Sequence, residues 1–180
     1  MKTGWRVATL HDTCEMYQPK TISTKDMVAD GAYPVFGANG EIGRYDKYNH
    51  EEPQLLITCR GATCGTVNVS QPKSWITGNS MVVRPRDGAI DLSFLAYLFR
   101  GGIDLSRAIT GAAQPQITRT NLAPMEIRFP ESLSEQQRIV EELTDLQSHT
   151  NSLRRLFERK QFMCAELKKS LLHEAFSGTL

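Results

Sequence analysis

The chain has 180 residues, of which 40% are hydrophobic and 23% charged, and its 21 basic and 20 acidic side chains leave a net charge of +1. This length fits one domain, or one domain with an appendage, and the composition is that of a folded protein. The longest purely apolar run, residues 94–99, is far shorter than the roughly 20 residues of a membrane span. The first residues lack the apolar core of a signal peptide, so we expect a cytoplasmic protein without a membrane partner. The small net charge excludes a domain that binds nucleic acid through bulk positive charge alone.

Residues 1–130 are rich in turns and contain all eight prolines and 12 of the 13 glycines. Short β-rich runs between these turns predict strands at residues 33–36, 55–58, 66–69, 80–84 and 126–129. Asp91 can cap a helix that ends at Gly101, and a second short helix is expected at residues 103–109. The pattern predicts an α+β fold with an irregular, twisted, β-rich globular domain and a few small helices.

Four cysteines and four histidines are scattered along the chain without the spacing of a disulfide framework or a zinc site. We therefore expect reduced structural thiols and no metal.

Residues 131–180 contain no proline and only one glycine, and they predict a single long helix. Ser134 is the expected N-cap with Gln137 at the capping-box spacing, while Pro130 precedes the helix and Gly178 follows it. From residue 134 to residue 176 the helix would be about 65 Å long.

Steps of four and three residues along this helix define a heptad seam. Its members are Ile139, Leu143, Leu146, Thr150, Leu153, Phe157, Lys160, Cys164, Leu167 and Leu171. A helix of this length extends beyond a 130-residue globule, whose radius of gyration is about 14 Å. Most of the seam must therefore pair with a second chain or another protein, and Thr150 and Lys160 can set its register.

Motifs that carry catalytic chemistry are missing from the sequence. It has no phosphate-binding loop, no dinucleotide-binding glycine pattern, no nucleophile elbow and no adenine-pocket tetrapeptide of amino-methyltransferases. The sequence therefore favours a recognition module with no catalytic residue of its own.

Short motifs spread over the whole chain carry a resemblance to a known family. They read GW at residues 4–5, TL at 9–10, KTISTK at 20–25, YPVFGANG at 33–40, IGRY at 42–45, LIT at 56–58, RG at 60–61, CG at 64–65, TGNS at 77–80, QPQIT at 114–118, SEQQRIV at 134–140 and AFSG at 175–178. In this order, and followed by the long helix, they resemble the specificity (S) subunit of type I restriction–modification systems.

The resemblance implies a target recognition domain over residues 1–131, which reads a DNA half-site, and a spacer helix over residues 132–180. Its implied partners are double-stranded DNA, methyltransferase subunits and restriction subunits. S-adenosylmethionine would be the cofactor of the methyltransferase partner, and this chain would bind none. An S subunit carries two such domains and two helices, whereas this sequence has one of each.

We expect a two-fold homodimer with antiparallel helices, because closed two-fold pairing is the commonest assembly. Such a dimer would read a bipartite site whose halves are inverted copies. Pairing with a full-length S subunit is the alternative partner arrangement.

Base reading requires arginine for guanine and asparagine or glutamine for adenine, and lysine, serine or threonine can contact phosphates. The candidates are polar residues on glycine-rich or proline-flanked turns: Lys20, Ser23, Thr24, Lys25, Asn39, Arg44, Tyr45, Lys47, Arg60, Lys73, Thr77, Asn79, Gln114, Gln116 and Arg119.

Each group of candidates also has a structural interpretation. Residues 20–25 can form a solvated turn, Asn39 a tight Asn-Gly turn, residues 44–47 a charged rim, Arg60 a buried structural arginine, residues 77–79 a turn before a strand, and residues 114–116 a cap between the domain and its helix.

Three other interpretations of function stay open at this point. The chain can be a coiled-coil DNA-binding or scaffold protein that acts without a methyltransferase, a nuclease fused to a helix, or a spare half that complements a full S subunit. Because the chain has little surplus positive charge, we expect weak, salt-sensitive DNA binding by the isolated chain and tighter binding with methyltransferase subunits.

Overall fold

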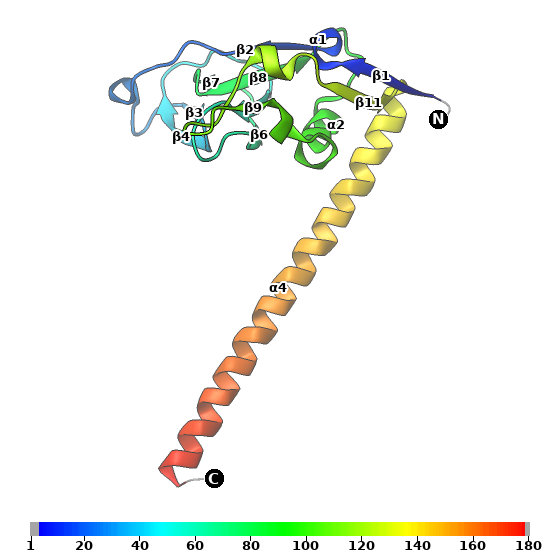
Figure 1. Cartoon of the computed structure of the whole chain (residues 1–180). Helices are drawn as coiled ribbons and strands as arrows, with labels where there is room; N and C mark the ends of the chain where they lie inside the picture. The colour runs from blue at the N-terminus through cyan, green and yellow to red at the C-terminus, as the bar shows by residue number, and fades with distance from the viewer. Residues whose placement is uncertain (1–3, 179–180) are drawn as a thin grey trace. The chain divides into compact units, whose positions relative to one another are not determined.

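A computed structural model describes residues 4–178, apart from the side chain of Thr24. The chain divides into two compact units, Met1–Arg138 and Ile139–Leu180. The first unit consists of short strands, short helices and the first turn of a long helix, and the second is the remainder of that helix (Figure 1). This confirms the expected α+β fold with one long C-terminal helix.

The largest sheet of the first unit has the strand order β2-β8-β5-β6. These strands are β2 (Cys14–Tyr17), β8 (Ser80–Pro85), β5 (Leu55–Thr58) and β6 (Val67–Val69), and each pairs antiparallel with its neighbour. All four residues of β5 are buried, as are the first four residues of β8. These consecutive buried side chains show that the middle of the sheet is covered on both faces.

A second sheet has the order β4-β3-β7 and packs against the first. Strands β3 (Tyr33–Gly37) and β4 (Gly40–Tyr45) form a hairpin, and β7 (Trp75–Ile76) lies parallel to β3. The buried cluster between the sheets contains Phe36 and Ile76 from one sheet and Leu56 and Val82 from the other. The core of the domain therefore lies at this sheet–sheet contact.

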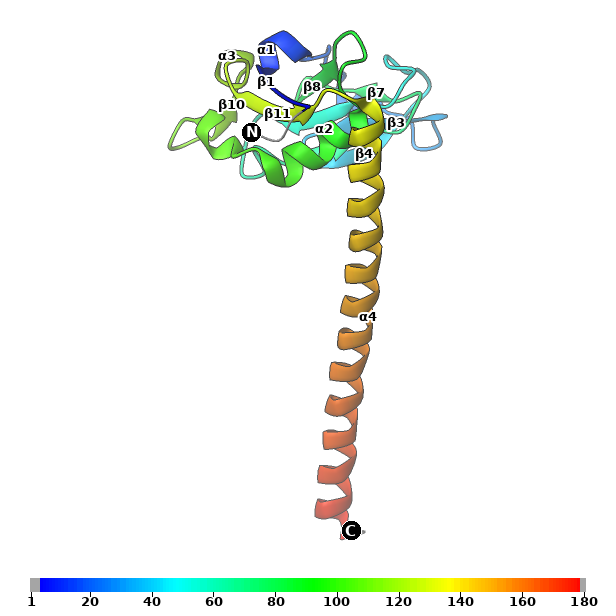
Figure 2. The same ribbon diagram turned by 90° about the vertical axis from the view of Figure 1, so that its right-hand side faces the viewer.

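The two ends of the first unit meet in a two-stranded ribbon. Strand β1 (Trp5–Thr9) pairs antiparallel with β11 (Glu126–Pro130), so that Trp5 lies opposite Pro130 (Figure 2). The short helix α1 (Leu10–Thr13) follows, and its Leu10 N–H donates to the Met125 carbonyl at 2.9 Å. This pairing closes the domain just before the long helix begins.

Short helical segments fill the chain between β8 and β11. They are α2 (Leu92–Tyr97), a π-helical turn (Leu98–Gly102), a 3-10 helix (Leu105–Ala108) and α3 (Arg119–Leu122), with a further 3-10 turn at Thr24–Asp26. The remaining strands, β9 (Ile109–Thr110) and β10 (Gln116–Ile117), form a small hairpin. Asp91 caps α2 as predicted, because its side chain accepts from the Phe94 N–H at 2.9 Å.

The long helix α4 (Leu133–Ser177) begins one residue before the N-cap expected from the sequence. The predicted N-cap, Ser134, was wrong: the hydroxyl of Ser132 accepts from the Glu135 N–H at 3.4 Å. Ser132 is followed three residues later by Glu135, which is also the spacing of a capping box.

The earlier start places Gln136 in the domain core, where it is fully buried. Its Oε1 accepts from the Asp91 N–H at 2.8 Å, and its Nε2 donates to the carbonyls of Ala89 and Pro130 at 3.0 and 2.8 Å. This side chain therefore binds the first turn of α4 to the start of α2 and the end of β11.

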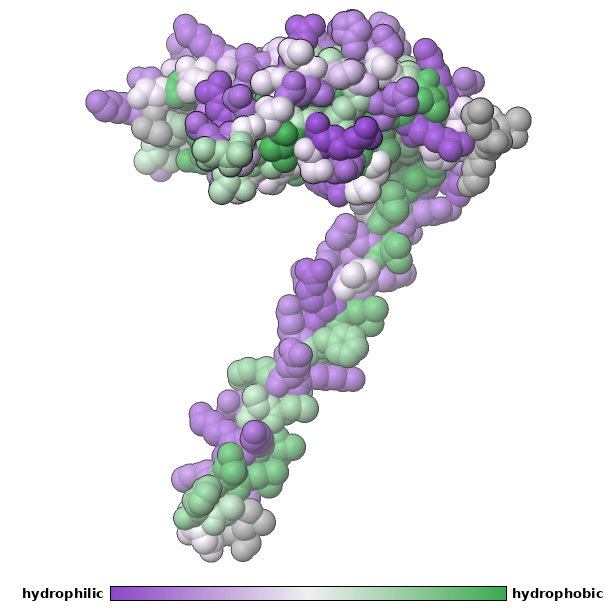
Figure 3. All heavy atoms as spheres, in the orientation of Figure 1, coloured by the Kyte–Doolittle hydropathy of each residue, from purple (hydrophilic) through white to green (hydrophobic). Residues whose placement is uncertain are grey.

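Large hydrophobic side chains in the heptad seam of α4 are exposed to solvent in the single chain. Leu146 is 62% exposed, Phe157 62% and Leu167 61%, and Figure 3 shows hydrophobic side chains along the length of the helix. Gly178, with a φ of 72°, ends the helix as predicted. Over the described residues, no helix has an apolar stretch long enough to cross a membrane.

Candidate nucleic-acid interface

Four turns of the first unit are joined to one another by hydrogen bonds. They are the β3–β4 turn at residues 37–40, the β5–β6 turn at 59–66, the β7–β8 turn at 77–79 and the β9–β10 turn at 111–115. We call this group of turns the loop cluster.

Specific hydrogen bonds join the turns of the loop cluster. The Thr58 hydroxyl donates to the Ala38 carbonyl. The Cys59 N–H donates to the Asn79 carbonyl at 3.1 Å, and the Gly61 N–H donates to the Pro115 carbonyl at 3.1 Å. An antiparallel bridge between Arg60 and Gln116 completes the set. Turns that are distant in sequence are therefore held at fixed positions relative to one another.

The loop cluster and the first residue of β10 present five of the predicted DNA-reading side chains to solvent: Asn39, Arg60, Asn79, Gln114 and Gln116. Within the described part of the chain, none of these side chains has a hydrogen-bond or ion-pair partner. The structure thus brings together one guanidinium and four amides, which are the groups that read guanine and adenine.

Arg60 is exposed, so its alternative interpretation as a buried structural arginine was wrong. It is followed by Gly61, whose φ of 86° lies in the left-handed region that favours glycine. This backbone conformation turns the chain sharply and leaves the guanidinium on the outside of the turn.

The tip of the β9–β10 turn depends on a second glycine with a positive φ. Gly111 has a φ of 86°, and a Cβ at this position would lie 2.5 Å from the Gln114 carbonyl oxygen. Glycine is therefore required to bring residues 114–116 back toward the β5–β6 turn.

Two free cysteines, Cys59 and Cys64, lie close to Arg60 in the sequence. Burial raises the pKa of Cys59 to about 11 and also raises the pKa of Cys64, so both thiols stay protonated at neutral pH.

The segment with Lys20, Ser23 and Lys25 is attached to the edge of the loop cluster. Gln18 donates from its side chain to the Gly78 carbonyl at 2.9 Å, and the Gly78 N–H donates to the Thr21 hydroxyl at 3.1 Å. The two lysines are exposed, whereas the side chain of Thr24 lies outside the described residues.

Other predicted candidates lie apart from these contacts. Arg44 donates from Nε to the Gly31 carbonyl at 2.7 Å and from a terminal nitrogen to the Ala32 carbonyl at 2.9 Å. Tyr45 packs edge-on against Trp75, with the ring centroids 5.2 Å apart. Lys47 is exposed beyond the end of β4. These interactions give Arg44 and Tyr45 structural roles, and DNA contact by the group stays a prediction.

Three more candidates differ in their surroundings. Thr77 is only 1% exposed and cannot touch DNA without a rearrangement. Lys73 has a φ of 52° in the turn before β7, and Arg119 is exposed in the first turn of α3. Gln18, Thr21 and Thr58 were not predicted as site residues, because their role depends on contacts between distant turns.

Residues 2–160 match the family model described as the type I restriction modification DNA specificity domain. The chain belongs to this family. The match confirms the resemblance carried by the sequence motifs, and it places the loop cluster on a DNA specificity domain. No curated protein matches the chain.

Solved structures have the same fold. The crystal structure of the type I restriction–modification S subunit from M. genitalium is 21% identical with a TM-score of 0.69, over 96% of this chain and 46% of that one. The HsdS subunit from Thermoanaerobacter tengcongensis is 22% identical with a TM-score of 0.65, over 100% of this chain and 46% of that one.

A structure described as showing complex assembly and conformational transition of the type I R-M system has a TM-score of 0.80 and 23% identity, over 100% of this chain and 47% of that one. The chain therefore spans slightly less than half the length of each of these three chains.

Proposed function

We propose that this chain is a DNA sequence-recognition subunit of a type I restriction–modification system and has no catalytic activity of its own. Residues 1–131 act as a target recognition domain for one half-site, and residues 132–180 act as the spacer helix. The single observation that carries the proposal is the loop cluster, which presents unpaired arginine and amide side chains on a specificity-family domain.

The loop cluster supplies the chemistry of base reading. Arg60 can donate two hydrogen bonds to the O6 and N7 of guanine, and Asn39, Asn79 or Gln116 can pair with the N6 and N7 of adenine. Lys20 and Lys25 on the adjoining segment can contact phosphates, which position the domain without selecting a sequence.

The seam of α4 is proposed to pair with a second copy of the chain. Leu146, Leu153 and Leu167 are each more than half exposed, and water contact with such a row is unfavourable. The Thr150 hydroxyl donates to the Leu146 carbonyl at 2.8 Å. This polar residue of the seam therefore keeps a hydrogen-bond partner when a second helix covers it. Two copies would present two recognition domains and a bipartite site. A full-length S subunit offering the same seam is the alternative partner.

A second apolar face of α4 is proposed to receive the methyltransferase subunits. Phe162, Ala165, Leu172 and Phe176 follow heptad steps of their own, with Lys169 between them. At about 100° per residue they lie roughly 100–160° around the axis from the first seam. Phe162 is 67% exposed and Phe176 is 89% exposed, so a helix paired through one face keeps the other available. S-adenosylmethionine would be bound by that partner.

A selection experiment tests the proposal. The full chain is mixed with type I methyltransferase subunits, and duplexes are selected from a random pool at physiological salt. We expect enrichment of a bipartite sequence, and weaker, salt-sensitive binding by the chain alone. Equal enrichment without the methyltransferase would favour a DNA-binding scaffold that acts alone, and enrichment of no sequence would contradict the proposal.

A further inference from the structure

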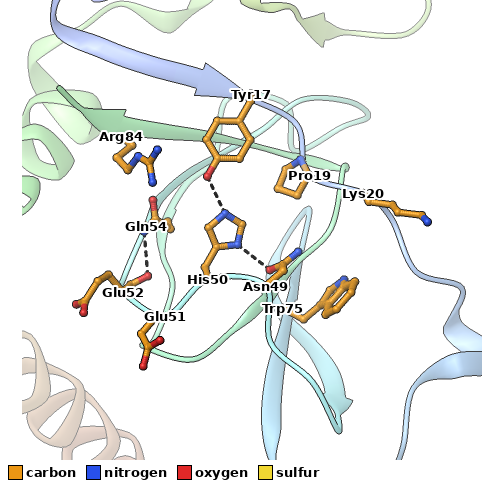
Figure 4. A pocket seen from close by; sticks show the side chains of 10 residues that line it. All are labelled: Tyr17, Pro19, Lys20, Asn49, His50, Glu51, Glu52, Gln54, Trp75 and Arg84. Carbon is orange, nitrogen blue, oxygen red and sulfur yellow. Dashed lines mark hydrogen bonds between the residues drawn. The ribbon is translucent and has the colours of Figure 1, made fainter.

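The first unit contains an open cavity of about 510 Å³ outside the loop cluster. Tyr17 from β2, His50 from the β4–β5 loop and Trp75 from β7 line it, and Figure 4 shows the side chains of Gln54 and Trp75 on opposite sides of His50. Of the residues proposed to contact DNA, Lys20 alone also lines this cavity, at its rim.

Hydrogen bonds fix the orientation of the His50 ring. The Asn49 Oδ1 accepts from the Ile76 N–H at 2.8 Å, while the Asn49 Nδ2 donates to the Ile76 carbonyl at 2.9 Å. The same Oδ1 lies 2.7 Å from His50 Nδ1, so in the neutral ring Nδ1 carries the proton and donates to it. His50 Nε2 then accepts from the Tyr17 hydroxyl at 2.8 Å.

Tyr17 and His50 together form a flat aromatic surface, and the Arg84 guanidinium lies over the Tyr17 ring, 6.0 Å from its centroid. Their ring planes differ by 16°, and their centroids are 5.9 Å apart. Because the Tyr17 oxygen and His50 Nε2 are in hydrogen-bond contact, the rings meet at their edges rather than face to face. Burial raises the pKa of Tyr17, so its hydroxyl stays protonated as the donor.

Gln54 brings an unpaired acceptor to the same cavity. Its side chain is held by donation from Nε2 to the Glu52 carbonyl at 2.9 Å, and the residue is only 5% exposed. Among the residues that the structure describes, Oε1 has no donor within reach. Such a buried carbonyl is unfavourable unless a ligand or a water molecule supplies the donor.

The charges around the cavity nearly balance. Glu51 and Glu52 offset Lys20 and Arg84, and Arg84 also pairs with Glu15 outside the cavity. This balance, with a flat aromatic surface and the buried unpaired acceptor of Gln54, suits a planar ligand that carries an N–H donor.

We propose that this cavity binds a nucleobase, which stacks on the Tyr17–His50 surface and donates an N–H to Gln54 Oε1. The phosphate of the nucleotide then lies near Lys20 at the rim. Base–aromatic stacking of this kind tolerates any base, and the Gln54 acceptor adds a preference for bases with a donor at that edge.

The base can come from DNA or from a free nucleotide. The segment that carries Lys20 also carries Gln18 and Thr21, which bind Gly78 of the loop cluster. This segment therefore connects the loop cluster to the rim of the cavity, and a base from DNA must leave its stack to enter it.

Fluorescence of Trp75 gives the test. The chain has two tryptophans, so the full chain with Trp5→Phe leaves Trp75 as the only indole. It is titrated with dAMP, dCMP, dTMP, inorganic phosphate and short single-stranded and duplex oligonucleotides. Saturation by nucleotides supports the proposal with a free nucleotide as the source, and saturation by oligonucleotides alone supports it with DNA as the source. The proposal is overturned if inorganic phosphate changes the Trp75 fluorescence as much as the nucleotides do. It is also overturned if none of these ligands gives a saturable change.

Two variants keep the result tied to the cavity. Gln54→Leu is expected to weaken binding about fivefold through loss of one hydrogen bond, whereas Gln71→Leu on an exposed turn should leave it unchanged. Lys20→Ala, an exposed substitution that does not threaten folding, should weaken binding of nucleotides but not of nucleosides. The proposed site is wrong if Lys20→Ala changes the binding of neither nucleotides nor nucleosides. It is also wrong if Gln54→Leu folds and binds nucleotides as tightly as Gln71→Leu does.

Discussion

The two units of the chain treat their large apolar side chains in opposite ways. In the first unit, Leu55, Leu95 and Leu122 are fully buried. In the second, Leu146 and Phe157 are each 62% exposed and Phe176 is 89% exposed. Apolar burial is the main stabilising contribution to a folded domain, so the first unit is complete as a single chain. The second unit is proposed to gain this contribution when another helix covers it.

The largest expected effect concerns this difference directly. Replacing Leu146 and Leu153 together by Asp puts carboxylates into the proposed seam of both copies, and should weaken self-association at least about 1000-fold. Ser148→Asp with Ser152→Asp, on the other side of the helix, is the matched control. Sedimentation across a concentration series measures the effect. A dimer that persists in the Leu146/Leu153 variant would show that the seam is not the interface.

The next effect concerns the first turn of α4, which belongs to the buried unit. Gln136→Leu removes three hydrogen bonds and leaves the Asp91 N–H and the Ala89 and Pro130 carbonyls unpaired. We expect the free energy of unfolding to fall by about 3 kcal/mol. Gln137→Leu, at the exposed neighbouring position, should change it little. Urea unfolding measures the stability of both variants. Equal stability would show that the hydrogen bonds of Gln136 do not stabilise the first unit.

A smaller effect, on DNA binding, is expected at the loop cluster, because its exposed side chains are proposed to contact DNA and do not stabilise the fold. Arg60→Ala should weaken specific DNA binding about 10- to 100-fold and relax the preference at one base pair. Arg86→Ala, an exposed arginine outside the loop cluster, is the control. Fluorescence anisotropy with cognate and single-mismatch duplexes measures both. A uniform loss on all sequences would mean that Arg60 contacts a phosphate instead.

The smallest effect is a pH dependence of the first unit. Burial, together with the nearby Arg84 charge, lowers the pKa of His50 below its usual 6.5. The folded state therefore favours the neutral ring, and this contribution is complete above pH 6.5 and is lost as the pH falls toward the folded pKa. His50→Gln should flatten the decline of the melting temperature between pH 7 and 5, while His11→Gln should not. An identical decline in both variants would assign the effect to other groups.

The sequence predicted the parts of the fold that depend on local patterns. Strand β5 and the Asp91 cap of α2 agree with the structure, and the long helix ends at Gly178 as its turn signal indicated. Strands such as β1 and β7 were missed because they are short and gain their pairing from distant partners. The predicted helix start was wrong because Ser134 was taken as the cap from its spacing to Gln137, whereas the Ser132 hydroxyl accepts from the Glu135 N–H.

Individual residues of the candidate site could be predicted from the sequence, but their grouping in space could not. The turns suggested Asn39, Arg60, Asn79 and Gln116 from residue type alone. Their grouping depends on hydrogen bonds such as Cys59 to Asn79 and Gly61 to Pro115, which join turns far apart in sequence. No local pattern encodes these contacts, and none separates the unpaired Arg60 from the hydrogen-bonded Arg44.

The central claim is that the loop cluster selects the DNA sequence while α4 joins two copies of the chain. A genome-wide map of N6-methyladenine, in cells that express the full chain with type I methyltransferase subunits, tests both parts. We predict a bipartite motif with inverted-repeat halves, which changes at one position in each half when Arg60→Ala replaces the original chain. A motif with unrelated halves would contradict the homodimer, and an unchanged motif with Arg60→Ala would contradict reading by the loop cluster.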